Sequence, residues 1–107
     1  MLTDMDIKKV MQQAQDLQNK MQKAQDALEN IEITGTAGAG DYIVTVIITG
    51  KGVTRKVHIA DKLINVEDKA MLEDLIAAAY NNAKSKLDDA IKVMMSKFNI
   101  PPELLGN

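Results

Sequence analysis

The sequence contains no cysteine and no tryptophan, and His58 is its only histidine. Without cysteine there are no disulfides and no thiolate chemistry. A single histidine also excludes a zinc site built from cysteine and histidine ligands. The only aromatic residues are Tyr42, Tyr80 and Phe98, too few for the stacking platform of a protein that binds single-stranded nucleic acid.

Long hydrophobic runs are also missing. No apolar stretch approaches the ~20 residues that a membrane-spanning helix needs. The opening residues Met1-Leu2-Thr3-Asp4 lack the basic and apolar regions of a secretion signal. We therefore expect a soluble, cytoplasmic protein that does not bind membranes. A chain of 107 residues is enough for one domain, residues 1–107, with one modest core.

The chain also lacks an excess of positive charge, which DNA-binding proteins usually carry for their contacts with phosphates. The 13 Lys and Arg residues are outnumbered by 15 Asp and Glu residues, so the formal net charge is −2. Composition alone does not suggest a DNA-binding protein. Binding to DNA would need basic side chains that are collected locally in the assembled protein.

The N-terminal segment, residues 1–31, is predicted to form one long helix from Thr3 to Asn30. Thr3 and Asp6 have the spacing of a capping box, in which each side chain accepts a hydrogen bond from the other residue's backbone N–H. Apolar or small side chains recur at intervals of three and four, the a/d spacing of a coiled-coil seam. They are Ile7, Val10, Ala14, Leu17, Met21, Ala24, Leu28 and Ile31.

Residues 31–60 change to a period of two, which indicates β-strands. Ile31 and Ile33 begin a first strand, and the glycine-rich stretch 35–40 is expected to break it as a flexible loop. The β-branched run 42–49 predicts a largely buried strand, and the alternation over 53–59 predicts a third. Gly50-Lys51-Gly52 suits the tight turn between these two strands. We predict a three-stranded antiparallel meander.

Residues 65–99 predict a second long helix, beginning near Val66 with Asn65 as its cap. An apolar stripe again steps by four and three through Ile76, Tyr80, Ala83, Leu87, Ala90 and Met94. Pro101 and Pro102 end the helix because neither can donate a backbone N–H. Residues 100–107 are expected to be a flexible tail. The predicted class is α+β, with two long helices and a small antiparallel sheet.

The helix lengths predict an extended shape and a homodimer. About 28 residues form a rod of roughly 40 Å, whereas a compact domain of this size is about 35 Å across. The ends of the helices must therefore project, and their apolar seams would be exposed in a monomer. The two helices of one chain can also pair with each other, and the three strands leave two open edges. A symmetric dimer covers the remaining apolar surface on both copies.

Candidate catalytic groups are few, and we predict that the protein is not an enzyme. His58 is expected on the solvated face of the third strand, with no partner pattern of a catalytic triad. The acidic doublets Glu67-Asp68, Glu73-Asp74 and Asp88-Asp89 place adjacent side chains about 100° apart on a helix, so no doublet can close on one ion. The glycine-rich stretch lacks the spacing and following helix of a phosphate loop. We expect no cofactor, metal or small-molecule substrate.

Lysine and glutamine side chains on the outer face of the first helix are the remaining functional signal. Lys20 and Lys23 lie one turn apart, and Lys9 and Gln13 continue nearby. Such groups can contact phosphates, with the amides adding hydrogen bonds, although a solvated coiled-coil face has the same composition.

Several motifs, in order and over nearly the whole chain, resemble the YbaB/EbfC nucleoid-associated proteins. The most specific is Met71-Leu72-Glu73-Asp74-Leu75-Ile76-Ala77-Ala78-Ala79-Tyr80-Asn81-Asn82-Ala83. The others are Met11-Gln12-Gln13-Ala14-Gln15, Met21-Gln22-Lys23-Ala24-Gln25, Thr34-Gly35 with the glycine stretch, Gly50-Lys51-Gly52 and Lys56-Val57-His58-Ile59.

The resemblance implies a tweezer-like homodimer with a sheet-containing base and helical arms that embrace double-stranded DNA. It also implies a nucleoid location, weak sequence preference and no cofactor. DNA contacts are expected from the first helix and the end of the last one. The candidate residues are Lys8, Lys9, Gln12, Gln13, Lys20, Lys23, Lys92 and Lys97. The alternative hypothesis is an interaction adaptor whose projecting coiled-coil-like helices grip another protein.

Overall fold

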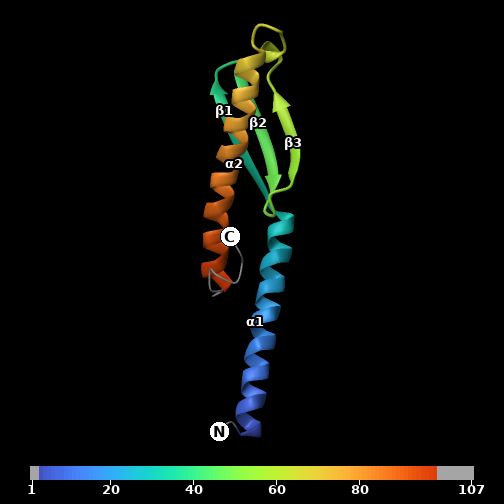
Figure 1. Cartoon of the computed structure of the whole chain (residues 1–107), viewed down its shortest axis with the longest axis vertical. Helices are drawn as coiled ribbons and strands as arrows, with labels where there is room; N and C mark the ends of the chain where they lie inside the picture. The colour runs from blue at the N-terminus through green and yellow to red at the C-terminus, as the bar shows by residue number, and fades with distance from the viewer. Residues whose placement is uncertain (1–2, 99–107) are drawn as a thin grey trace.

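The computed structural model describes residues 3–98, which form an elongated α+β protein (Figure 1). Its principal extents are 73 × 21 × 18 Å and its radius of gyration is 20.4 Å, against about 13 Å for a compact domain of 100 residues. The elements in chain order are α1 (Asp4–Asn30), β1 (Glu32–Ala39), β2 (Tyr42–Thr49), β3 (Thr54–Ile59), the short 3₁₀ helix η1 (Asp61–Leu63) and α2 (Lys69–Phe98). The predicted fold class is confirmed.

Helix α1 begins with the predicted capping box. The Thr3 hydroxyl accepts a hydrogen bond from the Asp6 backbone N–H at 3.2 Å, and the Asp6 carboxylate accepts one from the Thr3 backbone N–H at 3.2 Å. These bonds satisfy N–H groups that the first helical turn leaves without partners. At its other end α1 passes straight into β1, because Ile31 is extended with φ −91° and ψ 150°.

The three strands form an antiparallel sheet in the order β1-β2-β3, which confirms the predicted meander. β1 and β2 pair along their whole lengths, from Glu32 opposite Thr49 to Ala39 opposite Tyr42. β3 pairs with β2 from Val44 opposite Ile59, and the register shifts between Ile47 and Ile48. Within residues 3–98 the sheet has three strands, and β2 alone has a partner on both sides.

The prediction that residues 35–40 form a flexible loop is wrong. Residues 35–39 continue β1, and only Gly40 and Asp41 form the turn. Gly35 faces α2 so closely that an added Cβ would collide with the backbone of Ala79 and Ala83. Glycine is required there because the helix backbone packs directly against the strand. A composition that suggests a loop instead marks a site of close approach.

The predicted start of the second helix is also wrong by three residues. α2 begins at Lys69, after η1 and a turn that sequence reasoning did not predict. Asn65 nevertheless acts as a cap, because its side-chain oxygen accepts a hydrogen bond from the Asp68 backbone N–H at 2.8 Å. Asn65 also donates to the Lys62 carbonyl at 3.0 Å. These bonds hold the turn that lets the chain reverse onto the sheet. The predicted tail, residues 100–107, lies outside the described residues.

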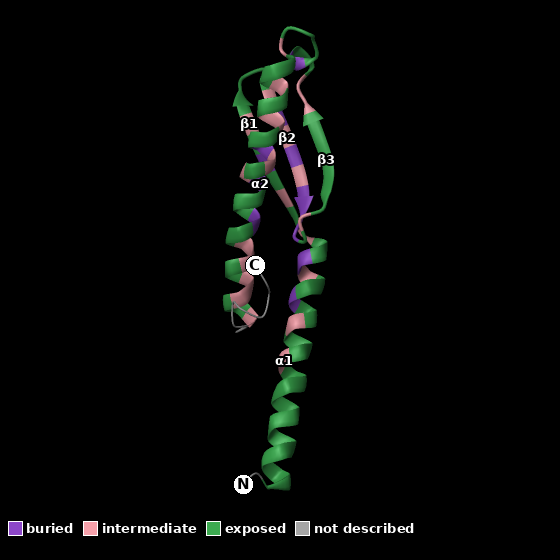
Figure 2. Ribbon diagram, viewed as in Figure 1, coloured by how far each residue is buried: buried purple, intermediate pink, exposed green. Residues whose placement is uncertain are grey.

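The hydrophobic core lies between α2 and one face of the sheet (Figure 2). β2 contributes Val44, Val46 and Ile48, all fully buried, and α2 contributes the small residues Ala79 and Ala83 together with Leu87. Leu63 of η1 closes the end of this core with 0% exposure. Buried and less buried residues alternate along β2, as expected for a strand in a sheet that has one face covered by a helix.

The two edges of the sheet differ. At the β1 edge, the Thr36 backbone N–H donates to the Asn82 side chain at 3.0 Å, and the Lys86 ammonium donates to the Thr34 carbonyl at 3.0 Å. Side chains of α2 thus satisfy backbone groups that would otherwise be open. Within residues 3–98, β3 pairs only with β2, so its outer edge presents free backbone groups.

Replacing Gly35 with alanine should lower the free energy of unfolding by about 2 kcal/mol, as expected for a side chain forced into a close contact. Chemical denaturation at matched protein concentration measures this change. Gly40→Asn is the control, because Gly40 has φ 58° with no atom within 4 Å of an added Cβ, and asparagine tolerates that conformation. Equal destabilisation by both variants would contradict the close-packing explanation.

Candidate nucleic-acid interface

Helix α1 is an arm that projects from one end of the sheet. α2 runs beside only the half of α1 that adjoins the sheet, so the N-terminal half of α1 extends alone (Figure 1). The buried residues of α1 are Ala24 and Leu28, both in the half next to the sheet. Farther out, the apolar seam is open: Ile7 is 44% exposed and Val10 is 55% exposed.

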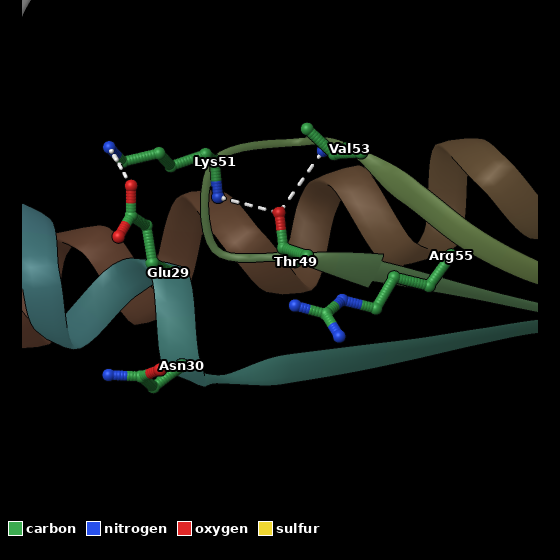
Figure 3. A pocket seen from close by; sticks show the side chains of 6 residues that line it. All are labelled: Glu29, Asn30, Thr49, Lys51, Val53 and Arg55. Carbon is green, nitrogen blue, oxygen red and sulfur yellow. Dashed lines mark hydrogen bonds and ion pairs between the residues drawn. The ribbon is translucent and has the colours of Figure 1, made fainter.

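The base of the arm is fixed to the turn between β2 and β3. Gly50 lies so close to α1 that an added Cβ would collide with the Leu28 carbonyl. The Thr49 hydroxyl accepts hydrogen bonds at 3.2 Å from the backbone N–H groups of Lys51 and Val53, and so holds the turn in shape (Figure 3). The direction of the arm relative to the sheet is therefore set by backbone packing as well as by side chains.

Ion pairs surround this junction. The Lys51 ammonium lies 2.8 Å from the Glu29 carboxylate, and the hydrogen bond and positive charge of Lys51 lower the pKa of Glu29 (Figure 3). Arg55 lies 4.0 Å from Glu32. Exposed pairs of this kind contribute little to stability. They do neutralise the basic groups at the base, which leaves the arm as the better candidate for phosphate contacts.

All eight candidate DNA-contacting residues are exposed. Lys8, Lys9, Gln12 and Gln13 lie on the part of α1 that projects alone. Lys20 and Lys23 lie farther along the same helix, toward the sheet, and Lys92 and Lys97 lie in the last two turns of α2. The ion pairs among residues 3–98 use Lys51, Arg55 and Lys62, so none of these candidate lysines is neutralised by such a pair.

The helical spacing brings most of the α1 candidates to one side of the arm. Within about 100° of arc lie Lys9, Gln12, Gln13, Lys20 and Lys23, which we call the lysine–glutamine stripe. Lys8 lies at its margin. On α2, Lys92 and Lys97 are five residues apart and so point about 140° away from each other. One straight duplex can follow the stripe, whereas Lys92 and Lys97 do not share a face.

Sequence reasoning did not single out the residues that fix the arm and α2 to the sheet. Gly50, Asn82 and Lys86 make these contacts. The Gly50-Lys51-Gly52 turn was predicted, but its close approach to α1 is a long-range contact without a local signal. Asn82 belongs to the most specific of the family motifs, but the motif does not indicate what its side chain contacts. Lys86 resembles the other lysines of the helix, so nothing in the sequence distinguishes it from a solvated residue.

Sites of other kinds are not found in the described part of the chain. Between residues 3 and 98 no cluster of three or more His, Asp or Glu side chains is arranged to hold a metal ion. Neither α1 nor α2 is both long and apolar enough to cross a membrane. His58 is exposed on β3.

The fold and the exposed stripe define a small α+β protein with a projecting helical arm. Residues 4–100 match the sequence profile of the YbaB/EbfC DNA-binding family, and the chain belongs to this family. The resemblance seen in the sequence motifs is thereby confirmed.

Two relatives agree with this assignment, and a solved structure shares the fold. A nucleoid-associated protein of Francisella philomiragia is 53% identical over 85 residues, which cover 79% of this chain and 74% of the relative. One of Rickettsia akari is 43% identical over 96 residues, or 86% of this chain and 88% of the relative. An uncharacterized protein of Helicobacter pylori has the same fold, with a TM-score of 0.68 at 16% identity over 91% of this chain and 97% of that one.

Proposed function

We propose that the protein is a non-enzymatic, nucleoid-associated homodimer that binds double-stranded DNA with little sequence preference. The observation that carries the proposal is the lysine–glutamine stripe on a projecting helix, in a chain that belongs to a DNA-binding family. Lysine ammonium groups contact phosphates, and glutamine amides add hydrogen bonds to phosphate or sugar oxygens. The net charge of −2 is compatible with this because the stripe concentrates lysines on one face.

The type of basic residue on the arm, lysine rather than arginine, supports low sequence specificity. The commonest base-specific contact in DNA complexes is made to guanine by arginine or lysine, and the planar fork of arginine fits it best, whereas backbone contacts carry no sequence information. The only arginine of the chain is Arg55, at the base of the arm and beside Glu32. The stripe offers lysines, which act as point charges toward phosphates. Contacts with the backbone should therefore dominate those with base edges.

The exposure of the arm supports the proposal that two copies of the chain associate. The half of α1 that projects alone is about 20 Å of helix, and a helix of this length is marginal in water without tertiary packing. Its exposed Ile7 and Val10 offer apolar surface to a partner. The open edge of β3 and the 43% exposure of Val57 offer a further surface. Identical surfaces on both copies are what a symmetric dimer uses.

The shape we propose for the dimer is that of tweezers. If a two-fold axis runs along the long dimension of the protomer, both arms project from the same side of a sheet-containing base. The stripes of the two arms then flank a common duplex. Each arm contributes its own lysines, so dimerisation doubles the number of phosphate contacts made at once.

A protein-binding function is favoured by a different observation. At the end of the molecule far from the arm, Ile64 is 64% exposed and Val66 is 90% exposed, in the turn before α2. Exposed apolar residues that lie together can mark a contact with another protein. Capture of partners from nuclease-treated extract, with and without Ile64→Ser and Val66→Ser, separates an adaptor from a protein that is retained only through DNA.

Replacing both Lys20 and Lys23 with alanine should weaken DNA binding by a similar factor on unrelated sequences. It should also reduce the slope of log affinity against log salt by about one for each phosphate that the variant no longer binds. Fluorescence anisotropy with several random-sequence duplexes measures both effects.

The matched control is the double variant Lys69→Ala with Lys84→Ala, which removes two exposed lysines of α2 that, like Lys20 and Lys23, form no ion pair among residues 3–98. Equal reductions of affinity in the two double variants would show that net charge, rather than the stripe, determines binding. Unchanged affinity and slope in the first variant would remove Lys20 and Lys23 from the interface.

The dimer should sediment with twice the 11.7 kDa mass of the chain. Because the protein has no cysteine, Gln15→Cys places a single label on α1 outside the stripe. Mixed donor- and acceptor-labelled protein should show efficient energy transfer between the two arms, and excess unlabelled protein should abolish it. A dimer without energy transfer would contradict the tweezer shape, and a sedimenting monomer would contradict the dimer itself.

A further inference from the structure

Asp16 lies in the centre of the lysine–glutamine stripe. It is four residues from both Gln12 and Lys20, and seven residues from both Lys9 and Lys23. Residues at these spacings share one face of a helix. Asp16 is exposed, as are its neighbours on the stripe. A carboxylate therefore stands among the side chains that are best placed to meet phosphates.

Three of the four other carboxylates of α1 are engaged in contacts of their own. Asp6 forms the capping box with Thr3. The Asp26 carboxylate accepts a hydrogen bond from the Gln22 amide at 2.9 Å, and Glu29 pairs with Lys51 at 2.8 Å. In the described chain, residues 3–98, no hydrogen bond or ion pair joins Asp16 to another side chain. Its charge is not committed to a structural contact.

This position opposes DNA binding in two ways. A phosphate held by Lys9 or Lys20 lies within one or two helical turns of the carboxylate and is repelled by it, with partial screening by salt. Asp16 also precedes Lys20 by four residues, the orientation in which an acidic and a basic side chain attract each other on a helix. This attraction acts without a direct ion pair, and it weakens the pull of the Lys20 ammonium group on a phosphate.

We infer that Asp16 sets the affinity of the arm for DNA, holding it below the value that the lysines alone would give. The inference rests on the proposed function, and it assigns to that site the one acidic side chain that lies within the arc of the stripe. Because the repulsion acts on the phosphate backbone, it lowers affinity for all sequences alike. The arm is thereby a weak and readily reversible contact rather than a tight clamp.

The test compares Asp16→Asn with Asp26→Asn in the full chain, on one random-sequence duplex across a salt series. Both variants remove one negative charge from the same helix, and asparagine at position 26 still accepts the Gln22 hydrogen bond. Asp16→Asn should tighten binding by about threefold at low salt, and the gain should shrink as salt rises. Asp26→Asn should change affinity less. Asp16→Glu, which keeps the charge, should bind like the unsubstituted protein.

Equal gains from Asp16→Asn and Asp26→Asn would overturn the inference, because affinity would then follow net charge. An unchanged affinity in Asp16→Asn, while Lys20→Ala with Lys23→Ala still weakens binding, would also overturn it and leave the proposed function standing. Absence of DNA binding by the unsubstituted protein at low salt would instead refute the proposed function. Circular dichroism of each variant checks that the helix content is retained.

Discussion

The close contact between Gly35 of β1 and the backbone of Ala79 and Ala83 on α2 determines how the rest of the molecule is arranged. It holds a helix of 30 residues along strands of only eight residues. At about 1.5 Å per helical residue and 3.4 Å per strand residue, the helix is longer than the sheet by more than about 15 Å. α2 must therefore run past the sheet, and its overhanging part is what α1 lies beside.

The small size of the sheet also explains why the molecule presents an arm. One face of the sheet is covered by α2, and its β1 edge is closed by Asn82 and Lys86. Little apolar surface is left to bury α1, whose buried residues, Ala24 and Leu28, both lie in the half next to the sheet. The outer half of the helix is consequently available for binding. Its charge pattern, rather than the acidic composition of the whole chain, governs the proposed interaction with phosphates.

Sequence patterns predicted those features that depend on local spacing. The seam and capping box defined α1, and the alternating β-branched residues defined β2. Sequence patterns did not predict that residues 35–39 form a strand or that α2 begins at Lys69. Long-range strand pairing and helix packing override the local composition at these two places. The stripe on α1 follows from helical spacing and could be predicted. Which residues touch DNA, and how two copies combine, depend on partners, so these assignments stay predictions.

The most direct test of phosphate binding by the arm is the affinity of the unsubstituted protein for a short random-sequence duplex, measured across a salt series. Log affinity should fall linearly with log salt, with a slope of about 0.9 for each phosphate contacted, and scrambling the duplex should change little. Several contacts are expected, since the arm carries Lys8, Lys9, Lys20 and Lys23. No binding even at low salt would contradict a DNA-binding arm and favour a function in protein interaction.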